Sequence, residues 1–422
     1  MKSGIFLSII LFVIITAGCT SEEKITEPEA VKSGRLKISF DKILDMTELE
    51  EISLLLTRIG HETISKTIKT NETSSIFLFD KVIEPGIWHV KIGIKLSSAS
   101  SSYEEDINVL PNFVTAAALT KGNSGMFKFE YAWNKQIEFH DFGINPVFTR
   151  NNSVNSPGLG VASSFILYEE NKYKMWYANM YPDRKYDINY AESGDGINWQ
   201  SKSQSAVISP GTGNAWDSYA VYPGAVIKEG SLYKMYYVGV TGYSSDSYVG
   251  LATSADGINW SKHPEPVIAF PFRRMAVNTV LKYAGNYMLY YNFTDLRSGE
   301  TGIGLITSAD GLVWSNAKDH IITIGQQWET NYLISPCVRL ENGIFIMYYG
   351  TLVNNAFGIA ASTDGINWKK STNNPIFTKE KTEWAEQVRY PFVIKINDVF
   401  RLYYTGYRNG FLSIAFAEGL NL

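Results

Sequence analysis

Apolar and polar residues alternate along most of this chain, which is the pattern of strands with one buried face. Over residues 34–133 the alternating runs are short and end at clusters of Gly, Asn, Ser and Pro. Two of the clearest runs place their apolar residues at Leu36, Ile38 and Phe40, and at Trp88, Val90, Ile92 and Ile94. This pattern predicts a small antiparallel β-sandwich over residues 34–133.

The rest of the chain, residues 137–422, contains an internal repeat. The motif Ser-x-Asp-Gly-x-x-Trp occurs four times, with its aspartates 61, 54 and 54 residues apart at Asp195, Asp256, Asp310 and Asp364. An aromatic pair precedes each motif and a fifth pair follows the last: Trp176-Tyr177, Tyr236-Tyr237, Tyr290-Tyr291, Tyr348-Tyr349 and Tyr403-Tyr404. Five pairs on short strands predict an all-β, five-bladed β-propeller over residues 137–422.

The regularity of these motifs argues for a role in the scaffold. Asp-Gly supplies the left-handed backbone that a tight hairpin needs, so we expect the four aspartates to be turn residues and the aromatic pairs to be core. The fifth unit lacks its Asp-Gly-Trp element. Residues 143–148 resemble residues 373–377, which follow the fourth Trp. We therefore expect the segment before the first unit to supply the missing outer strand and close the ring.

The first residues have the features of a targeting segment. Lys2 precedes an apolar run, residues 5–15, that is too short to span a bilayer. Thr16-Ala17-Gly18-Cys19 resembles the lipobox of bacterial lipoproteins, in which the cysteine receives a lipid. We expect a signal peptide over residues 1–18, a lipidated Cys19, a flexible tether over residues 19–33 and anchoring in the bacterial cell envelope, facing the periplasm or the exterior. An ordinary secretory signal that happens to contain a cysteine is the alternative.

Composition excludes several function classes. A net charge of −4 offers no basic stripe for phosphate neutralisation, so we expect no nucleic-acid partner. The five histidines are scattered without metal-ligand spacing, and we expect neither a metal nor a cofactor. Cys337 lies in an apolar stretch and is expected to be a core residue. Aromatic residues make up 14% of the chain, which suits both pleated strands and sugar-stacking surfaces.

The repeat also resembles a known superfamily. Tyr-x-Met-Tyr-Tyr-x-Gly at residues 233–239, together with Ser-x-Asp-Gly-x-x-Trp, is similar to the five-bladed propellers of arabinanases, β-xylosidases, invertases and β-mannoside phosphorylases. The resemblance covers residues 137–422 and implies activity on an extracellular oligosaccharide or polysaccharide, in a funnel at one end of the ring axis. Residues 84–90 and 119–123 loosely resemble immunoglobulin-like or transthyretin-like accessory modules.

Glycoside cleavage needs one acid to protonate the leaving oxygen and a second carboxylate or an equivalent nucleophile. In the related hydrolases these acids typically precede prolines on the inner strands. The corresponding positions in this chain are Ser163, Tyr222, Val277, Ser335 and Tyr390, and none is acidic. The sequence thus departs from the family pattern where the chemistry is expected.

A second set of carboxylates lies five to seven residues before each inner-strand proline, beside a tryptophan. Asp217, Glu329 and Glu386 are the candidate catalytic residues, expected at the rim of the funnel. Capping of local backbone amides is the equally open structural alternative. Candidate sugar-stacking residues are Trp216, Tyr222, Trp328, Trp384 and Tyr390. The arginines Arg273, Arg274 and Arg389 are expected either to clamp an anionic sugar, to pair with these acids, or to form buried structural ion pairs.

Two functions remain open from the sequence. The resemblance favours a carbohydrate-active enzyme, either a hydrolase or a phosphorylase, that uses acids among Asp217, Glu329 and Glu386. The missing inner-strand acids favour a lipoprotein that binds glycans, or serves as a scaffold, with a degenerate glycosidase site.

Overall fold

The computed structural model describes residues 33–40, 49–69, 77–121, 127–135, 137–153, 158–243, 246–330, 332–353 and 355–421. The described elements are strands apart from two short 3₁₀ turns, η2 (Arg150–Asn152) and η3 (Lys379–Lys381). The predicted signal peptide, Cys19 and the tether up to residue 32 lie outside the described residues and stay predictions. Within the described ranges, no helix has the length and apolar character to cross a membrane.

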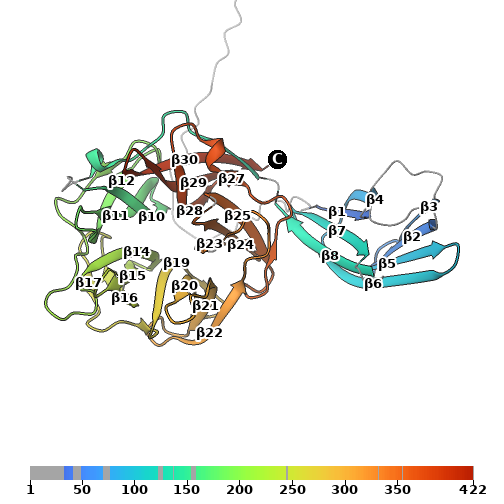
Figure 1. Cartoon of the computed structure of the whole chain (residues 1–422), viewed down its shortest axis with the longest axis horizontal. Helices are drawn as coiled ribbons and strands as arrows, with labels where there is room; N and C mark the ends of the chain where they lie inside the picture. The colour runs from blue at the N-terminus through green and yellow to red at the C-terminus, as the bar shows by residue number, and fades with distance from the viewer. Residues whose placement is uncertain are drawn as a thin grey trace, which may run out of the picture.

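The first eight strands form two sheets that share one core, drawn from blue to teal in Figure 1. One sheet has the order β4 (Phe77–Ile83), β1 (Gly34–Phe40), β7 (Val114–Lys121) and β8 (Phe127–Asn134). The other has the order β3 (Ile64–Lys69), β2 (Leu49–Thr57), β5 (Gly86–Leu96) and β6 (Ser100–Val109). Leu36 and Trp88 are among the residues buried between them. The predicted sandwich is present, although β1 and β7 pair in parallel.

The remaining strands form five blades arranged in a ring, as Figure 1 shows. Blade 1 has β10 (Gly160–Glu169), β11 (Lys172–Met180), β12 (Tyr186–Ser193) and β13 (Gln200–Ser201). Blade 2 has β14 (Ala220–Glu229), β15 (Leu232–Val240), β16 (Ser247–Ser254), β17 (Ser261–Lys262) and β18 (Ile268–Ala269). Blade 3 has β19 (Arg273–Tyr283), β20 (Asn286–Asp295), β21 (Thr301–Ser308) and β22 (Ser315–Ile322).

The last two blades complete the ring. Blade 4 has β23 (Leu333–Glu341), β24 (Ile344–Thr351), β25 (Ala356–Ser362), β26 (Lys369–Lys370) and β27 (Phe377–Thr378). Blade 5 has β28 (Gln387–Ile396), β29 (Val399–Arg408), β30 (Phe411–Asn421) and β9 (Ile137–Asp141). Blades 1 and 5 are joined in one eight-stranded sheet, because β10 and β30 form a parallel pair at Gly160 and Leu412. Because β9 precedes blade 1 in the chain and pairs antiparallel with β30, the N-terminal segment closes the ring as predicted. The paired strand is residues 137–141, slightly earlier than expected, while Phe148 bridges to Ile414.

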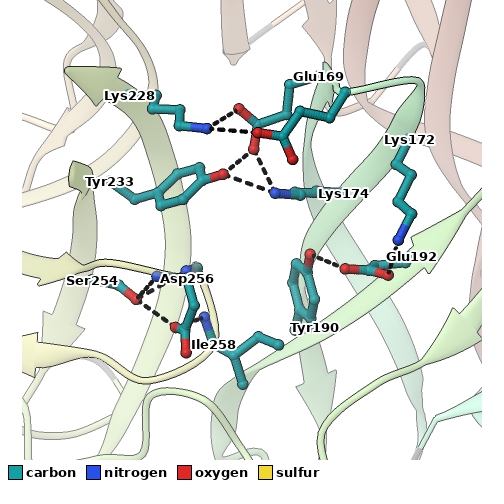
Figure 2. A network of polar contacts seen from close by, with 12 residues as sticks. Glu169, Lys172, Lys174, Tyr190, Glu192, Lys228, Tyr233, Ser254, Asp256 and Ile258 are labelled. Atoms are coloured by element: carbon teal, nitrogen blue, oxygen red, sulfur yellow. Dashed lines mark hydrogen bonds and ion pairs between the residues drawn. The ribbon is translucent and has the colours of Figure 1, made fainter. Parts of the chain in front are cut away.

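The first member of each aromatic pair connects one blade to the next. In four blades its side chain donates a hydrogen bond to the glycine carbonyl of the following blade's Asp-Gly turn: Trp176 to Gly257 (2.8 Å), Tyr236 to Gly311 (3.0 Å), Tyr290 to Gly365 (3.0 Å) and Tyr403 to Gly196 (2.9 Å). The aspartates of these turns accept backbone N–H bonds inside their own hairpins, as expected of turn residues. Asp256 in Figure 2 is one example.

Acidic residues at the ends of inner strands form a second kind of link between blades. Glu169, the last residue of β10, contacts Lys174 of its own blade together with Lys228 and Tyr233 of the next, as Figure 2 shows. Burial disfavours the charged carboxylate, but these hydrogen bonds outweigh burial and lower the pKa of Glu169 to about 2. Glu229, at the end of β14, repeats the arrangement with blade 3.

Between blades 4 and 5 the lysine comes from outside the ring. Glu341 ends β23 as Glu169 ends β10, but Phe400 occupies the position that Tyr233 has in blade 2. Lys135, from the connection between the sandwich and β9, donates a hydrogen bond to Glu341 at 2.9 Å. Its ammonium also lies 5.0 Å from the centre of the Phe400 ring and 5.3 Å from that of Phe113 in the sandwich. The Lys135 side chain is only 5% exposed, so the pair is part of a buried contact between the two domains.

Replacing Lys135 with Met should therefore destabilise the protein, because Glu341 would lose its nearest cation while staying buried. We expect the free energy of unfolding to fall by about 3 kcal/mol, a cost typical of breaking a buried pair by removing one partner. Chemical denaturation measures this change. Lys95→Met is the matched control, since Lys95 pairs with Glu50 on the exposed sandwich surface and its loss should cost less than about 1 kcal/mol. Equal costs for the two variants would contradict this account.

Candidate functional site

The five inner strands share an irregularity near the ring axis. Each of β10, β14, β19, β23 and β28 shifts register against its neighbour within the blade, at Ala162/Phe165, Tyr222/Ala225, Val277/Thr279, Ile334/Cys337 and Arg389/Phe392. Ser163, Ser335 and Tyr390 adopt φ values of 51°, 54° and 54° at these bulges. Non-glycine residues in this left-handed region are strained, and such strain concentrates at functional sites.

A pocket of about 640 Å³ lies where these bulges converge. It takes side chains from all five inner strands, including every position that corresponds to a family acid: Ser163, Tyr222, Val277, Ser335 and Tyr390. The structure thus has a cavity at the end of the ring axis, where the resemblance implies the site. Among the described residues that line the pocket, none is an aspartate or a glutamate, and the one charged side chain is Arg274.

Tyrosines dominate the polar wall of this central pocket. The rings of Tyr186 and Tyr222 are 4.7 Å apart and inclined by 43°. Burial, reinforced by neighbouring tyrosines, raises the pKa of Tyr186 to about 12 and also raises the pKa of Tyr222. Both hydroxyls therefore stay neutral near pH 7 and can exchange hydrogen bonds with a ligand, but they are not activated nucleophiles.

Two further tyrosines that line the pocket are exposed to solvent. Tyr243, just before β16, is 64% exposed, and Tyr332, just before β23, is 37% exposed. Arg184 donates a hydrogen bond to the Tyr243 hydroxyl at 2.7 Å and so restrains that side chain. Exposed aromatic faces beside a polar pocket suit the stacking of sugar rings.

The structure does not place Asp217 in the pocket. Its carboxylate is 3% exposed and accepts hydrogen bonds from the Tyr237 hydroxyl at 3.1 Å, from Lys262 at 2.6 Å and from the Gly211 backbone at 3.1 Å. All these partners belong to blade 2 or to the loop before it. The expected place of Asp217 is the rim of the funnel, but Tyr237, Lys262 and the Gly211 backbone hold its carboxylate against its own blade, and it does not line the pocket.

Glu329 repeats this arrangement in blade 4. It accepts hydrogen bonds from the Tyr349 hydroxyl at 2.7 Å and from Lys370 at 2.5 Å, and it caps the backbone amides of Gly325 and Gln326 at 2.8 Å each. The open alternative of backbone capping is therefore the one that the structure favours for Glu329, as it is for Asp217.

In the other blades the hydroxyl of the second residue of the aromatic pair also has a hydrogen-bond partner. Tyr291 donates to Asp319 and Tyr404 donates to Asp141, while in blade 1 Ser153 takes the place of the acid beside Tyr177. In four blades a carboxylate therefore accepts the hydrogen bond of this tyrosine hydroxyl. We call these structural acids, Asp141, Asp217, Asp319 and Glu329, the latch acids. Glu386 stands apart from the latch acids: it is exposed, accepts a hydrogen bond from the Asn409 backbone at 3.3 Å and does not line the pocket.

The three tryptophans expected to stack on sugars also pack inside their blades. Trp216 lies 5.6 Å from Tyr237, Trp328 lies 5.7 Å from Tyr349, and Trp384 donates a hydrogen bond to Tyr404 at 3.0 Å. None of the three lines the central pocket. The structure therefore gives these three tryptophans a packing role within their blades, and their sugar-stacking role stays a prediction.

The predicted arginines have three different environments. Arg273 pairs with Asp319 at 2.9 Å, which is the structural alternative. Arg389 bonds to the side chain of Gln387 and does not line the pocket. Arg274 does line it. Of the candidate residues, the structure therefore brings together Tyr222, Arg274 and Tyr390.

Sequence reasoning missed several lining residues: Tyr186, Tyr243, Tyr332, Asn278 and Asn292. Asn278 directly follows Val277 at the bulge of blade 3, so alignment of the repeats could have found it. The loop tyrosines lie between repeated elements, where the sequence has no regular spacing to locate them. In the described part of the chain, no group of three or more His, Cys, Asp or Glu residues is placed to hold a metal ion.

Comparison with known families gives a match in the propeller. The family model described as beta-1,4-mannooligosaccharide phosphorylase, within glycoside hydrolase family 130, matches residues 134–357, just over half of the 422-residue chain. An uncharacterized protein of Mycobacterium tuberculosis is 24% identical over 205 residues, which cover 44% of this chain and 67% of that protein.

Solved structures with the same fold include glycosidases and phosphorylases. The β-1,2-mannobiose phosphorylase from Listeria innocua matches with a TM-score of 0.52 at 14% identity, covering 66% of this chain and 96% of that chain. The α-L-arabinofuranosidase from Lactobacillus brevis matches with a TM-score of 0.52 at 13% identity, covering 65% and 92%. At these identities the likeness shows the fold, which is that of five-bladed propeller glycosidases.

The latch acids give a direct test of their role. Asp217→Asn and Glu329→Gln should each lower the free energy of unfolding by about 1–3 kcal/mol, because a partly buried lysine and a buried tyrosine lose a charged acceptor. Both variants should bind saccharide as the wild type does, since neither side chain reaches the pocket. Thermal unfolding and calorimetric titration measure the two effects. Asp183→Asn, at an exposed carboxylate paired with Lys185, is the control. A stable Asp217 variant that no longer binds would restore the expected site role.

Proposed function

This chain belongs to the glycoside hydrolase family described as beta-1,4-mannooligosaccharide phosphorylase, and on that premise we propose that it binds β-linked mannooligosaccharides in the central pocket without cleaving them. One observation carries the proposal: the described residues that line the pocket include no carboxylate. The family and the fold make this a carbohydrate-active, glycoside-hydrolase-like protein. The described residues of the pocket include groups that can bind a sugar but no carboxylate that could assist its cleavage.

Cleavage of a glycosidic bond requires a proton for the departing oxygen, whether water or phosphate attacks the sugar. A carboxylic acid supplies that proton in most enzymes of this kind. At the five bulge positions this chain has serine, tyrosine or valine instead. The hydroxyls of Tyr186 and Tyr222 are held neutral, with raised pKa values, so they are poor proton donors in a transition state.

The same residues suit binding. Hydroxyl and carboxamide groups on the wall can exchange hydrogen bonds with sugar hydroxyls, while aromatic faces cover the apolar face of the ring. Tyr222 comes from blade 2 and Tyr390 from blade 5, and the exposed Tyr243 and Tyr332 add aromatic surface to the pocket. The bulged inner strands hold the wall residues on a rigid ring, which reduces the entropy lost on binding.

Titration with β-1,4-mannobiose to mannohexaose tests the binding half of the proposal. We expect saturable binding that Tyr222→Ala weakens by about tenfold or more, through loss of stacking and of a hydrogen bond. Tyr168→Ala is the matched control, because Tyr168 is a surface residue of β10 that does not line the pocket. Equal affinity in the wild type and in Tyr222→Ala would place the ligand elsewhere.

Incubation of the same oligosaccharides with and without phosphate tests the other half. We expect neither free mannose nor mannose 1-phosphate to accumulate above the rate without protein. Turnover that disappears on substitution of a pocket residue would overturn the non-catalytic assignment and establish a hydrolase or phosphorylase with an unrecognised proton donor.

We also propose that the protein is anchored to a bacterial membrane through a lipid on Cys19. The support is the lipobox-like Thr16-Ala17-Gly18-Cys19 after a short apolar run, followed by a polar stretch, residues 20–33. Such an anchor would hold the pocket outside the cytoplasm, where oligosaccharides are met.

Expression of the full chain in a bacterium with labelled palmitate tests the anchor. The wild type should carry the label and sediment with membranes, and Cys19→Ser should do neither. Cys337→Ser is the matched control and should behave as the wild type, because Cys337 is buried in the propeller. A labelled Cys19→Ser variant, or an unlabelled wild type, would refute the proposal.

A further inference from the structure

Two adjacent arginines on β19 have opposite environments. Successive side chains of a strand point to opposite faces, so Arg273 and Arg274 cannot share a partner easily. Arg273 is neutralised by Asp319 at 2.9 Å and lies 4.6 Å from the centre of the Phe293 ring. Arg274 faces the central pocket and is exposed to it.

The charge of Arg274 has no counterpart in the structure. Across the described ranges, Arg274 forms neither an ion pair nor a side-chain hydrogen bond, and its cross-strand neighbour Thr294, which also lines the pocket, is neutral. The nearby acids are occupied: Asp319 holds Arg273, and Asp295 accepts two backbone amides of its own turn at 2.9 Å. A lone guanidinium among neutral walls attracts an oxyanion, which it can bind through two parallel hydrogen bonds.

A second group without a partner lies further along the same strand. The side-chain oxygen of Asn278 is buried at the bulge of blade 3 and has no hydrogen-bond partner within the described chain. A buried acceptor left unpaired is unfavourable, and a ligand hydroxyl that reaches this oxygen through a small shift of the side chain would remove that cost. Beside it, Asn292 is held in position by the backbone N–H of Ser335, which donates to its side-chain oxygen at 3.1 Å.

The spacing of these two groups bears on the size of the ligand. Arg274 and Asn278 are four residues apart on one strand, which corresponds to roughly 13 Å between their backbones at the rise of a β-strand. One small ion cannot satisfy both. A saccharide that gives a hydroxyl to Asn278 and carries an oxyanion toward Arg274 can.

We propose that the central pocket selects an acidic saccharide, in which Arg274 binds a carboxylate or a phosphate ester on the sugar and Asn278 accepts a hydrogen bond from one of its hydroxyls. The inference rests on the proposed function and adds the class of ligand. Arg274 is a specificity residue: it distinguishes a charged sugar from its neutral counterpart, whereas the tyrosines serve both.

Calorimetric titration of the full chain with a matched pair of disaccharides tests this selection. β-1,4-Mannobiose and β-1,4-dimannuronate differ in the group at carbon 6, which is a hydroxymethyl in one and a carboxylate in the other. We expect the dimannuronate to bind at least about tenfold more tightly, and we expect the difference to shrink as salt is raised. Mannobiose 6-phosphate is the third ligand and separates a phosphate ester from a carboxylate as the preferred oxyanion.

Arg274→Gln should abolish the preference, by lowering the affinity for the dimannuronate to that for mannobiose. Arg273→Gln is the matched control on the other face of β19 and should retain the preference. Asn278→Leu should weaken the neutral and the acidic disaccharide alike, because the lost acceptor serves a hydroxyl common to both.

The outcomes separate this inference from the proposed function. Equal affinity for neutral and acidic ligands would overturn the selection by Arg274 and leave oligosaccharide binding intact. Binding of neither disaccharide would overturn both. Inorganic phosphate alone that binds with the same dependence on Arg274 and does not compete with the disaccharides would identify a free-anion site and refute the acidic saccharide.

Discussion

Four of the five junctions in the ring depend on a hydrogen bond from one blade to the next. A buried aromatic side chain donates to the glycine carbonyl of the neighbouring Asp-Gly turn, and the turn accepts it only because glycine tolerates a positive φ and leaves room. A Cβ on Gly311 would lie 2.4 Å from the Tyr236 hydroxyl. At the interface of blades 4 and 5, Tyr348 is buried without a hydrogen-bond partner in the described residues, because blade 5 lacks the motif. Phe139 packs against Tyr348 there and Lys135 pairs with Glu341, so the segment that joins the sandwich to the ring also completes the ring.

The second aromatic of each pair explains why Asp217 and Glu329 are held inside their own blades. A buried tyrosine hydroxyl needs an acceptor, and four blades supply a carboxylate while the first uses Ser153. Asp217 and Glu329 therefore recur in the sequence because they bind buried tyrosine hydroxyls, and not because they face the axis of the ring. Their lysine partners, Lys262 and Lys370, follow the repeated tryptophan by two residues, which makes the latch itself a feature of the repeat.

What remains at the axis is a pocket in which Arg274 is the one charged side chain among the described lining residues. The bulges bring Ser163, Ser335 and Tyr390 to its wall, at positions where related hydrolases carry acids. Loss of negative charge there has a second consequence, because Arg274 is left without an intramolecular partner. In the functions proposed here the absence of cleavage and the selection of a charged ligand are linked, because carboxylates that could donate a proton would also neutralise Arg274.

The sequence by itself determined the architecture. Strand alternation, four Asp-Gly-Trp motifs and five aromatic pairs specify hairpins and buried rows, and these depend on local backbone preference and on periodicity, which a sequence displays directly. The same repeat located the inner-strand positions around Tyr222, Ser335 and Tyr390. Only the tertiary structure decided which side chains face the axis. Asp217 and Arg274 look equally plausible as site residues in the sequence, yet Asp217 turns into its blade and Arg274 into the pocket. The reason is that packing between blades, and not spacing along the chain, sets the register shifts of the inner strands and the loops that carry Tyr243 and Tyr332.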